Sequence, residues 1–260
     1  MSIKDAGITI DQIESASCGN LLPPWDFHAE HILNFAGTIG QEILKPLGIG
    51  AIPIHNTRNS CATGGAAFQI AFMDVASGMH DCVLALAVEK GYMPDREQYL
   101  RFMNPPVKEG ETLPRYSGPV AKMANRCLVY MKKYGLTKEQ LAWVCSKNHN
   151  NASLNPLAQY RKPYSVEEVL ADPPVTEPFT RCMCAPNGDG GAAAILCSLK
   201  FARRYTTEPI FVATSVTQRG RDQYNPDEPD LDERVARETE ERAGIDPKDI
   251  GVLELADATA

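Results

Sequence analysis

The residue best placed for covalent chemistry is Cys61, which stands where an expected strand gives way to an expected helix. Free backbone N–H groups and the positive end of a helix dipole stabilise a thiolate, the form of cysteine that attacks carbonyl carbons. Gly64 follows three residues later, where a missing side chain would let the backbone approach a ligand. The alternative is that Cys61 is simply a small buried residue. The spacing indicates a nucleophile and leaves that structural interpretation open.

A second polar cluster spans residues 146–156 and contains His149, Asn150 and several further amides at the expected end of a helix. These side chains could recognise a polar ligand, so His149 and Asn150 are candidate substrate-binding residues. Asparagines also cap helices without any ligand. Both interpretations stay open at this point.

The sequence contains only weak candidates for a metal site or a nucleotide site. His28 and His31 have helical spacing but no third ligand nearby. The stretch Cys182-Met183-Cys184 is also a poor metal site, because successive strand residues face opposite sides. The sequence contains no Gly-x-Gly-x-x-Gly, Gly-Lys-Ser/Thr, Gly-x-Ser-x-Gly or His-Glu-x-x-His motif. We therefore expect neither a metal nor a nucleotide cofactor.

Composition excludes several classes of protein. The 260 residues are 43% hydrophobic and carry a formal net charge of -7, so no basic field exists to collect nucleic acid. The longest apolar run, residues 82–88, is far shorter than the roughly 20 residues that cross a membrane. The N-terminus does not resemble a secretory signal, and the eight cysteines lack the spacing of a disulfide scaffold. We expect a cytoplasmic protein with reduced thiols and no membrane insertion.

The elements that would position Cys61 alternate between strand and helix, which predicts a doubly wound α/β sheet. Residues 90–186 are polar, broken by prolines and poor in strand signal, and are expected to form an insertion. A glycine-rich turn at 187–191 should lead into the next strand. The expected strands are 13–18, 51–55, 82–88, 192–197, 210–216 and 252–255, and the expected helices are Asp26 to 44, 61–77, 118–134, 137–153 and 229–243.

A repeated Ala-Gly-Ile segment suggests that the chain contains two related units. Ala6-Gly7-Ile8 precedes Ile13 and an expected strand, and Ala243-Gly244-Ile245 precedes Ile250 and an expected strand at the same spacing. Chance is the alternative, because this tripeptide is a common helix exit. The earlier copy has few residues before it and the later copy few after it, so we expect that both units are cut.

The stretch 59–67, Asn-Ser-Cys-Ala-Thr-Gly-Gly-Ala-Ala, resembles the nucleophile motif of the thiolase superfamily. Three further stretches agree with that family in order, and the match covers essentially the whole chain. They are the strand exit at 87–90, the loop-domain motif of sterol-carrier-protein-type thiolases at 147–156, and the Asp-Gly-Ala-Ala turn at 186–193.

The resemblance implies a thiolase-like α/β fold of two similar halves, each with a mostly parallel five-stranded sheet between helices. It divides the chain into an N-terminal half at 1–89, a loop domain at 90–186, a closing strand at 187–203 and the start of a second half at 204–260. The first half would lack its opening strand, and most of the second half would be missing. Because that strand lies in the middle of the sheet, we expect a gap there.

The chemistry implied by the resemblance is acyl transfer. Cys61 would accept an acyl group from an acyl-CoA and pass it to CoA or to a carbon nucleophile, in thiolytic cleavage or Claisen condensation. Coenzyme A is then a substrate, and no other cofactor is needed. His149 would belong to the loop region that covers the substrate. The family also implies a role in lipid metabolism and a homodimer, or a hetero-oligomer if the chain is cut.

Departures from the family leave alternatives open. Ala256 stands where thiolases carry Asn or His, so Asp257 alone persists from that motif, and no Gly-His-Pro segment follows to activate the nucleophile. We therefore expect no turnover by this chain alone. One alternative is retro-aldol cleavage of a CoA thioester. Another is a non-catalytic subunit that completes its sheet against a partner chain, with Cys61 vestigial.

Overall fold

The computed structural model of the chain describes residues 2–21, 38–104, 108, 112, 114–206, 208–220, 229–256 and 258–260. These residues divide into two compact units. Unit 1 comprises Met1–Gly91 and Asp189–Leu253, and unit 2 comprises Tyr92–Gly188 and Glu254–Ala260.

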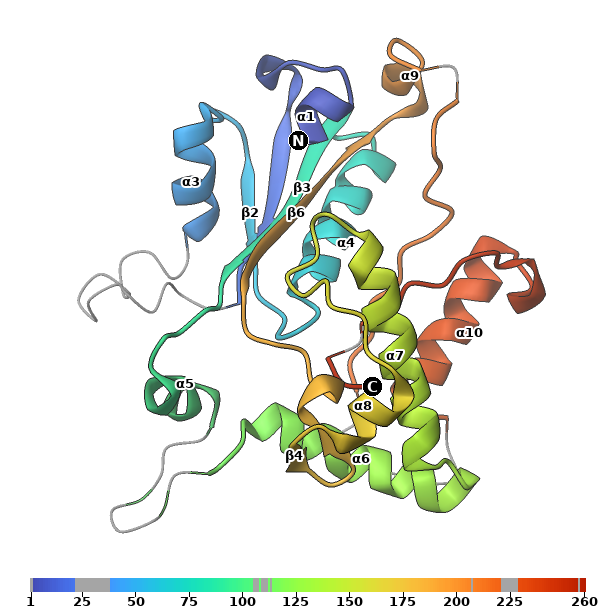
Figure 1. Cartoon of the computed structure of the whole chain (residues 1–260). Helices are drawn as coiled ribbons and strands as arrows, with labels where there is room; N and C mark the ends of the chain where they lie inside the picture. The colour runs from blue at the N-terminus through green and yellow to red at the C-terminus, as the bar shows by residue number, and fades with distance from the viewer. Residues whose placement is uncertain are drawn as a thin grey trace. The chain divides into compact units, whose positions relative to one another are not determined.

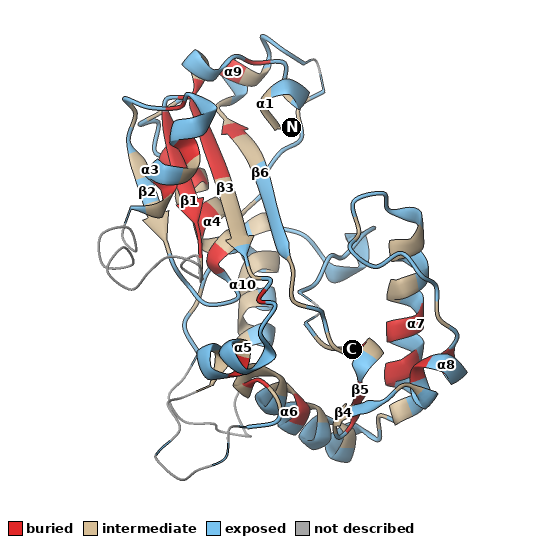
Figure 2. Cartoon of the chain, turned by 60° about the vertical axis from the view of Figure 1, so that its left-hand side comes forward, coloured by how far each residue is buried: buried red, intermediate tan, exposed pale blue. Residues whose placement is uncertain are grey.

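A four-stranded sheet in the order β2-β1-β3-β6 forms the centre of unit 1 (Figure 1). Strand β1 (Ser15–Gly19) lies parallel to β2 (Ile54–Thr57) and to β3 (Cys82–Lys90), and β6 (Asp189–Cys197) runs antiparallel to β3. All of β1 is buried, and Figure 2 shows this strand red throughout its length. The predicted α/β class with a mainly parallel sheet is confirmed.

Helices cover both faces of this sheet. Successive strand residues point to opposite faces, so Val83 and Ala85 pack against Ala71 of α4 (Thr63–Ala76) while Leu84 faces the other way. The opposite face is covered by α1 (Ser2–Asp5), α3 (Ile39–Leu44) with η2 (Lys45–Leu47), and α9 (Leu199–Ala202).

The start of α4 packs unusually closely on the end of β1. A Cβ atom at Gly19 would lie 2.9 Å from Cγ2 of Thr63 and 3.0 Å from its carbonyl oxygen. Such contacts leave no room for a side chain at position 19. Gly19 therefore fixes the height of the first turn of α4 above the sheet.

Two expectations about the sheet are wrong. The gap in its middle does not exist, because β1 forms ladders with β2 on one edge and β3 on the other. The predicted turn at 187–191 is largely strand, since β6 begins at Asp189. Glycine permits this: a Cβ on Gly191 would lie only 3.3 Å from the carbonyl oxygen of Ala87. The lack of side chains there lets β6 approach β3 closely.

The strands predicted at 210–216 and 252–255 are also wrong, because neither segment has regular secondary structure. Ile210 is 99% exposed and Val252 is 81% exposed. β-branched and aromatic residues favour strands, yet a strand forms only where a neighbour accepts its backbone hydrogen bonds. The helix between these segments, α10 (Leu231–Ala243), is present as expected. It is followed by η4 (Pro247–Asp249), as α1 is followed by η1 (Ile10–Gln12).

Unit 2 is built on two long helices, α6 (Gly118–Tyr134) and α7 (Lys138–Leu154), close to the predicted bounds. Helix α6 ends at Gly135 with φ of +70°, and the Thr137 side chain caps α7 by accepting from the Gln140 amide. The smaller elements are α5 (Arg96–Met103), α8 (Val166–Ala171), η3 (Arg181–Met183) and a hairpin of β4 (Pro174–Thr176) and β5 (Phe179–Thr180).

The apolar core of unit 2 joins these elements to the last residues of the chain. Its buried members are Ala124, Leu141, Ala142, Cys145, Val166, Val169, Phe179 and Met183. The Ala185 amide donates to the Ala258 carbonyl oxygen at 3.0 Å, and the Ala260 amide donates to that of Met183 at 3.0 Å. Within the described ranges, no helix combines the length and apolar character needed to cross a membrane.

Candidate active site

Cys61 lies in a tight turn, Asn59–Thr63, between β2 and α4; we call this the cysteine turn. Helix α4 begins at Thr63 and not at Cys61 as predicted. Ser60 has φ of +48°, a left-handed conformation that is uncommon for serine. The Thr63 hydroxyl accepts a hydrogen bond from the Asn59 amide at 2.8 Å and donates one to the Ser60 carbonyl oxygen at 2.6 Å. One buried hydroxyl thus braces both residues that precede Cys61.

Cys61 differs from the other seven cysteines in exposure. All eight are free thiols, and Cys61 alone is exposed, whereas the other seven are buried or half-buried. Burial raises the pKa of Cys18 and Cys145 to about 11 and that of Cys82 to about 12. Burial also raises the pKa of Cys182 to about 12, with a contribution from the Asp172 carboxylate. The same desolvation raises the pKa values of Cys127, Cys184 and Cys197.

Backbone donors stand directly after Cys61. The amides of Gly64 and Gly65 have no hydrogen-bond partner among the described residues. A Cβ at Gly64 would approach that of Ala87 at 3.4 Å, whereas one at Gly65 would meet no atom within 4 Å. Unpaired amides at a helix start can stabilise the oxyanion that forms when a thiolate attacks a thioester.

Polar contacts tie together the carboxyl ends of β1 and β3 at this edge of the sheet. The Asn20 side-chain amide donates to the Val88 carbonyl oxygen at 2.7 Å, and the Leu21 backbone amide donates to the Glu89 carboxylate. These bonds hold the two strand ends beside each other, which adds rigidity to the framework of the cysteine turn.

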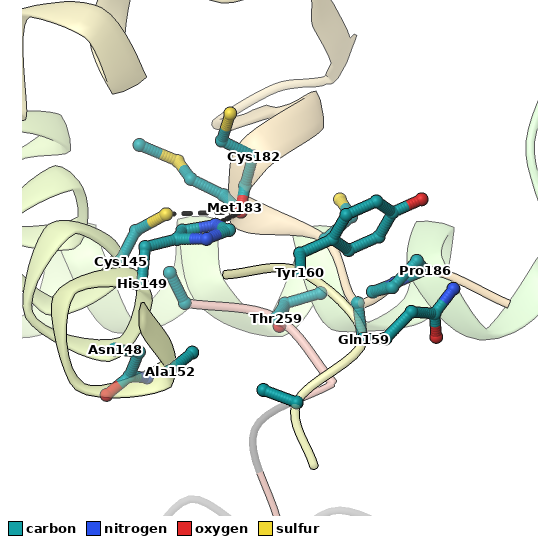
Figure 3. Close-up of a pocket in the computed structure, with 14 residues that line it drawn as sticks. Cys145, Asn148, His149, Ala152, Gln159, Tyr160, Cys182, Met183, Pro186 and Thr259 are labelled. Carbon is teal, nitrogen blue, oxygen red and sulfur yellow. Dashed lines mark hydrogen bonds between the residues drawn. The ribbon is translucent and has the colours of Figure 1, made fainter. Parts of the chain in front are cut away.

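A pocket of about 360 Å³ lies entirely within unit 2, and Figure 3 shows its lining side chains. Its wall is largely apolar and rich in sulfur, with a few polar groups. The lining residues are Cys145, Asn148, His149, Ala152, Ala158, Gln159, Tyr160, Cys182, Met183, Cys184, Ala185, Pro186, Thr259 and Ala260.

His149 lies inside α7, so it does not cap that helix; the chain leaves α7 at Asn155. Its Nε2 atom is 3.2 Å from the carbonyl oxygen of Cys182, which also accepts from the Cys145 thiol at 3.1 Å (Figure 3). A carbonyl oxygen can only accept, so Nε2 carries the proton. The ring meets Tyr164 edge to face at 4.8 Å.

The other predicted site residues have different outcomes. Asn150 is exposed, donates to the Ser146 hydroxyl at 3.4 Å, and does not appear among the described residues that line the pocket. Cys61 and Gly64 belong to unit 1, whereas His149 belongs to unit 2. Asp257 and the pair His28 and His31 lie outside the described residues. In the described part of the chain, no cluster of three or more His, Cys, Asp or Glu side chains could hold a metal.

Sequence reasoning missed most of the pocket. Cys145 and Ala152 lie four and three positions from His149 on α7 and therefore share its face, a spacing readable in the sequence. Asn148, next to His149, lies three and four positions from the same two residues. Cys182 is part of a 3-10 helix and not of a strand as predicted. Pairing of 183–185 with 258–260 is a long-range contact that no local signal marks.

No protein-family model matches the chain. Acetyl-CoA acetyltransferase from Methanothermobacter thermautotrophicus is 33% identical over 261 residues, which cover 98% of this chain and 66% of that protein. Bovine (Bos taurus) sterol carrier protein 2 is 34% identical over 85% of this chain and 44% of its own length. The chain thus spans from under half to about two thirds of these relatives.

A solved structure described as the Ltp2-ChsH2(DUF35) aldolase superposes with a TM-score of 0.75 at 22% identity, over 99% of this chain and 65% of that one. This likeness concerns the fold. The curated relatives, at 33% and 34% identity, show that the chain belongs to the thiolase superfamily.

Proposed function

We propose that the chain contributes the nucleophile Cys61 to acyl transfer from acyl-CoA through an acyl-enzyme, in the direction of thiolytic cleavage or of Claisen condensation. The observation that carries this proposal is an exposed thiol in a braced turn, followed by the unpaired amides of Gly64 and Gly65. The name of the archaeal relative, acetyl-CoA acetyltransferase, supports the same reaction class.

In the first step the Cys61 thiolate attacks the thioester carbonyl carbon, and a new carbon–sulfur bond forms while the bond to CoA breaks. CoA leaves as a thiolate and takes up a proton. Hydrogen bonds from the helix start lower the energy of the tetrahedral oxyanion. The acyl group then passes to the thiol of CoA or to a carbon nucleophile.

The pocket of unit 2 supports a binding role for His149, since it holds this side chain in an apolar surrounding. We propose that the pocket binds part of the acyl-CoA and that no further cofactor takes part. Eight free thiols support a location in the reducing cytoplasm. Acyl-CoA chemistry supports a role in lipid metabolism.

The test is the mass of the intact chain after incubation with acetyl-CoA and other short acyl-CoA donors. We expect a gain of one acyl group that hydroxylamine removes, because hydroxylamine cleaves thioesters. Cys61→Ser should show no such gain, while Cys127→Ser keeps it. An acyl group that remains in Cys61→Ser would contradict the proposal.

A second candidate reaction is retro-aldol cleavage of a 3-hydroxyacyl thioester, in which the bond between C2 and C3 breaks to give a carbonyl compound and a shorter thioester. Ala256 favours it, because this residue replaces the Asn or His that thiolase-like chemistry uses. Product analysis decides between the two reactions: an aldehyde or ketone indicates cleavage of this kind, and a CoA-dependent acyl product indicates thiolysis.

Association with a second chain is also proposed, as a homodimer or a hetero-oligomer. Large apolar side chains of unit 1 are exposed, among them Ile210 at 99%, Phe211 at 70% and Leu253 at 69%. Apolar surface of this kind gains free energy when it is covered. A mass measured by light scattering should exceed 28.5 kDa. If the chain is a non-catalytic subunit, Cys61→Ser leaves the activity of the complex unchanged.

A further inference from the structure

The pocket of unit 2 has a distinctive set of unused polar atoms. Nε2 of His149 lies 3.2 Å from the Cys182 carbonyl oxygen and donates to it, so Nδ1 is the ring nitrogen left for a ligand and acts as an acceptor when it carries no proton. Nε2 of Gln159 donates to the Asn187 carbonyl oxygen at 3.2 Å, which leaves Oε1 as an acceptor. The Thr259 hydroxyl is directed to the Met123 sulfur at 3.8 Å, so its lone pairs remain. Three polar side chains thus offer acceptor atoms.

Charged side chains are absent from the same wall. Among the lining residues that the structure describes there is no aspartate, glutamate, lysine or arginine. A phosphate or carboxylate group would find no countercharge and would meet lone pairs. The ligand group that suits this wall therefore carries a hydrogen-bond donor and no negative charge.

The apolar part of the wall suits an aromatic ring. Four sulfur-bearing side chains, Cys145, Cys182, Met183 and Cys184, line the pocket together with the ring of Tyr160, whose hydroxyl points away from His149 (Figure 3). Sulfur atoms make favourable contacts with aromatic rings. A volume of about 360 Å³ is near the lower end of small-molecule sites and fits a single ring with a short chain.

We propose that this pocket binds a hydroxyphenyl group, so that the substrates are CoA thioesters whose short acyl chain ends in a hydroxylated aromatic ring. The ring packs against the sulfur-rich wall, and its hydroxyl donates to Nδ1 of His149 or to Oε1 of Gln159. This inference rests on the proposed function and names the substrate class for it.

The test measures binding to Cys61→Ala, which cannot form an acyl-enzyme, so that binding is separated from chemistry. The probes are N-acetylcysteamine thioesters of 3-(4-hydroxyphenyl)propanoate, 3-phenylpropanoate and 3-cyclohexylpropanoate, with N-acetylcysteamine alone as the fourth ligand. Titration calorimetry gives the dissociation constants. We expect the hydroxyphenyl probe to bind about fivefold more tightly than the phenyl probe, the worth of one net hydrogen bond. The phenyl probe should bind about threefold more tightly than the cyclohexyl probe.

Two variants locate the hydroxyl contact. His149→Leu and Gln159→Leu each remove one acceptor, and in at least one of them the preference for the hydroxyphenyl probe should fall below about twofold. Gln159 is exposed, so its variant tests the contact even if His149→Leu unfolds unit 2. Lys147→Ala, an exposed position on the same helix outside the described lining, is the control and should keep the full preference.

Three results would overturn the inference: equal affinity for the hydroxyphenyl and phenyl probes, a preference that survives in both variants, or affinity for N-acetylcysteamine alone that matches the hydroxyphenyl thioester. The last result would mean that the pocket binds the amide N–H of the pantetheine arm, of which N-acetylcysteamine is the end. Failure of the proposed function appears separately, as the absence of an acyl-enzyme on wild-type Cys61 while the probe preferences persist.

Discussion

The cysteine turn of unit 1 and the pocket of unit 2 are built in different ways. Backbone atoms and one buried hydroxyl determine the turn, since Gly19 lies against the backbone of Thr63 and Thr63 braces the residues before Cys61. The pocket is lined by side chains, several of which are exposed and can change rotamer. The difference indicates that position matters most at the nucleophile, while the pocket can adapt to its ligand. An added methyl group should therefore lower the free energy of unfolding much more at the turn than at the pocket.

The largest expected effect is that of Gly19→Ala. The new methyl group would lie 3.0 Å from the Thr63 carbonyl oxygen, so α4 must shift on the sheet. We expect a loss of about 2–3 kcal/mol in the free energy of unfolding, measured by urea denaturation, together with slower alkylation of Cys61. Gly65→Ala is the control, because its methyl group meets nothing within 4 Å. Equal stability of the two variants would contradict the close packing at the turn.

Asp172→Asn should have the next largest effect, on unit 2. Asp172 accepts from the Cys182 amide at 2.8 Å and from Arg181 at 2.8 Å. Partial burial raises the pKa of this carboxyl, but its hydrogen bonds with Cys182 and Arg181 outweigh that effect and hold the pKa below its usual value. We expect a loss of about 1–2 kcal/mol at pH 7.

The sign of the pH dependence follows from the lowered pKa. Asp172 contributes stability above the ordinary aspartate pKa of about 3.9, and that contribution is lost as the pH falls through its folded-state pKa. The stability difference between wild type and Asp172→Asn should therefore shrink on acidification from pH 5 to about pH 3. A difference that grows over this interval would contradict the assigned hydrogen bonds.

Thr63→Val should have a smaller effect on stability and a clear effect on reactivity. It keeps the shape of the side chain but removes both hydrogen bonds to the turn, at a cost of about 1 kcal/mol. We expect the rate of Cys61 alkylation by iodoacetamide to fall several-fold and Thr63→Ser to restore it. Thr57→Val is the matched control, since it removes a threonine hydroxyl that donates to the Cys18 carbonyl oxygen at 3.0 Å. If Thr57→Val lowers the alkylation rate of Cys61 by the same factor, the bracing role of Thr63 is wrong.

The smallest expected effect is that of Gly188→Ala beside the pocket. A Cβ there would meet the end of the Gln159 side chain, which is exposed and can rotate away. We expect a change within about 0.5 kcal/mol by urea denaturation. A loss as large as that of Gly19→Ala would remove the contrast between turn and pocket.

Local sequence signals predicted local structure well and long-range pairing poorly. The two Ala-Gly-Ile segments illustrate this. Gly7 and Gly244 adopt nearly equal φ values of +68° and +66°, and a 3-10 helix follows each. After that the copies diverge: Ile13 is 3% exposed and leads into β1, whereas Ile250 is 42% exposed and no strand follows. The same local pattern forms a strand only where β2 and β3 supply partners.

The candidate site shows the same contrast between local signals, which the sequence carries, and long-range contacts, which it does not. The glycines and Thr63 near Cys61 are adjacent in sequence, so their motif predicted the strand-to-helix junction, although the helix begins two residues later than predicted. Sulfur atoms of the pocket come from α7, from η3 and from Cys184 directly after it, and residues 258–260 line it through pairing that no motif records. His149 was predicted from the polar cluster at 146–156 and from the family motif that contains it, while its partner, the Cys182 carbonyl oxygen, is marked by no sequence signal.

The most direct test of the account is the alkylation rate of each of the eight cysteines in the folded chain, measured by peptide mass spectrometry after brief exposure to iodoacetamide at pH 7.5. We predict that Cys61 reacts at least tenfold faster than the other seven, because it is exposed while burial raises the pKa of each of the others. Faster modification of any other cysteine, or protection of Cys61 equal to that of Cys18, would contradict the claim that the turn presents Cys61 as the nucleophile.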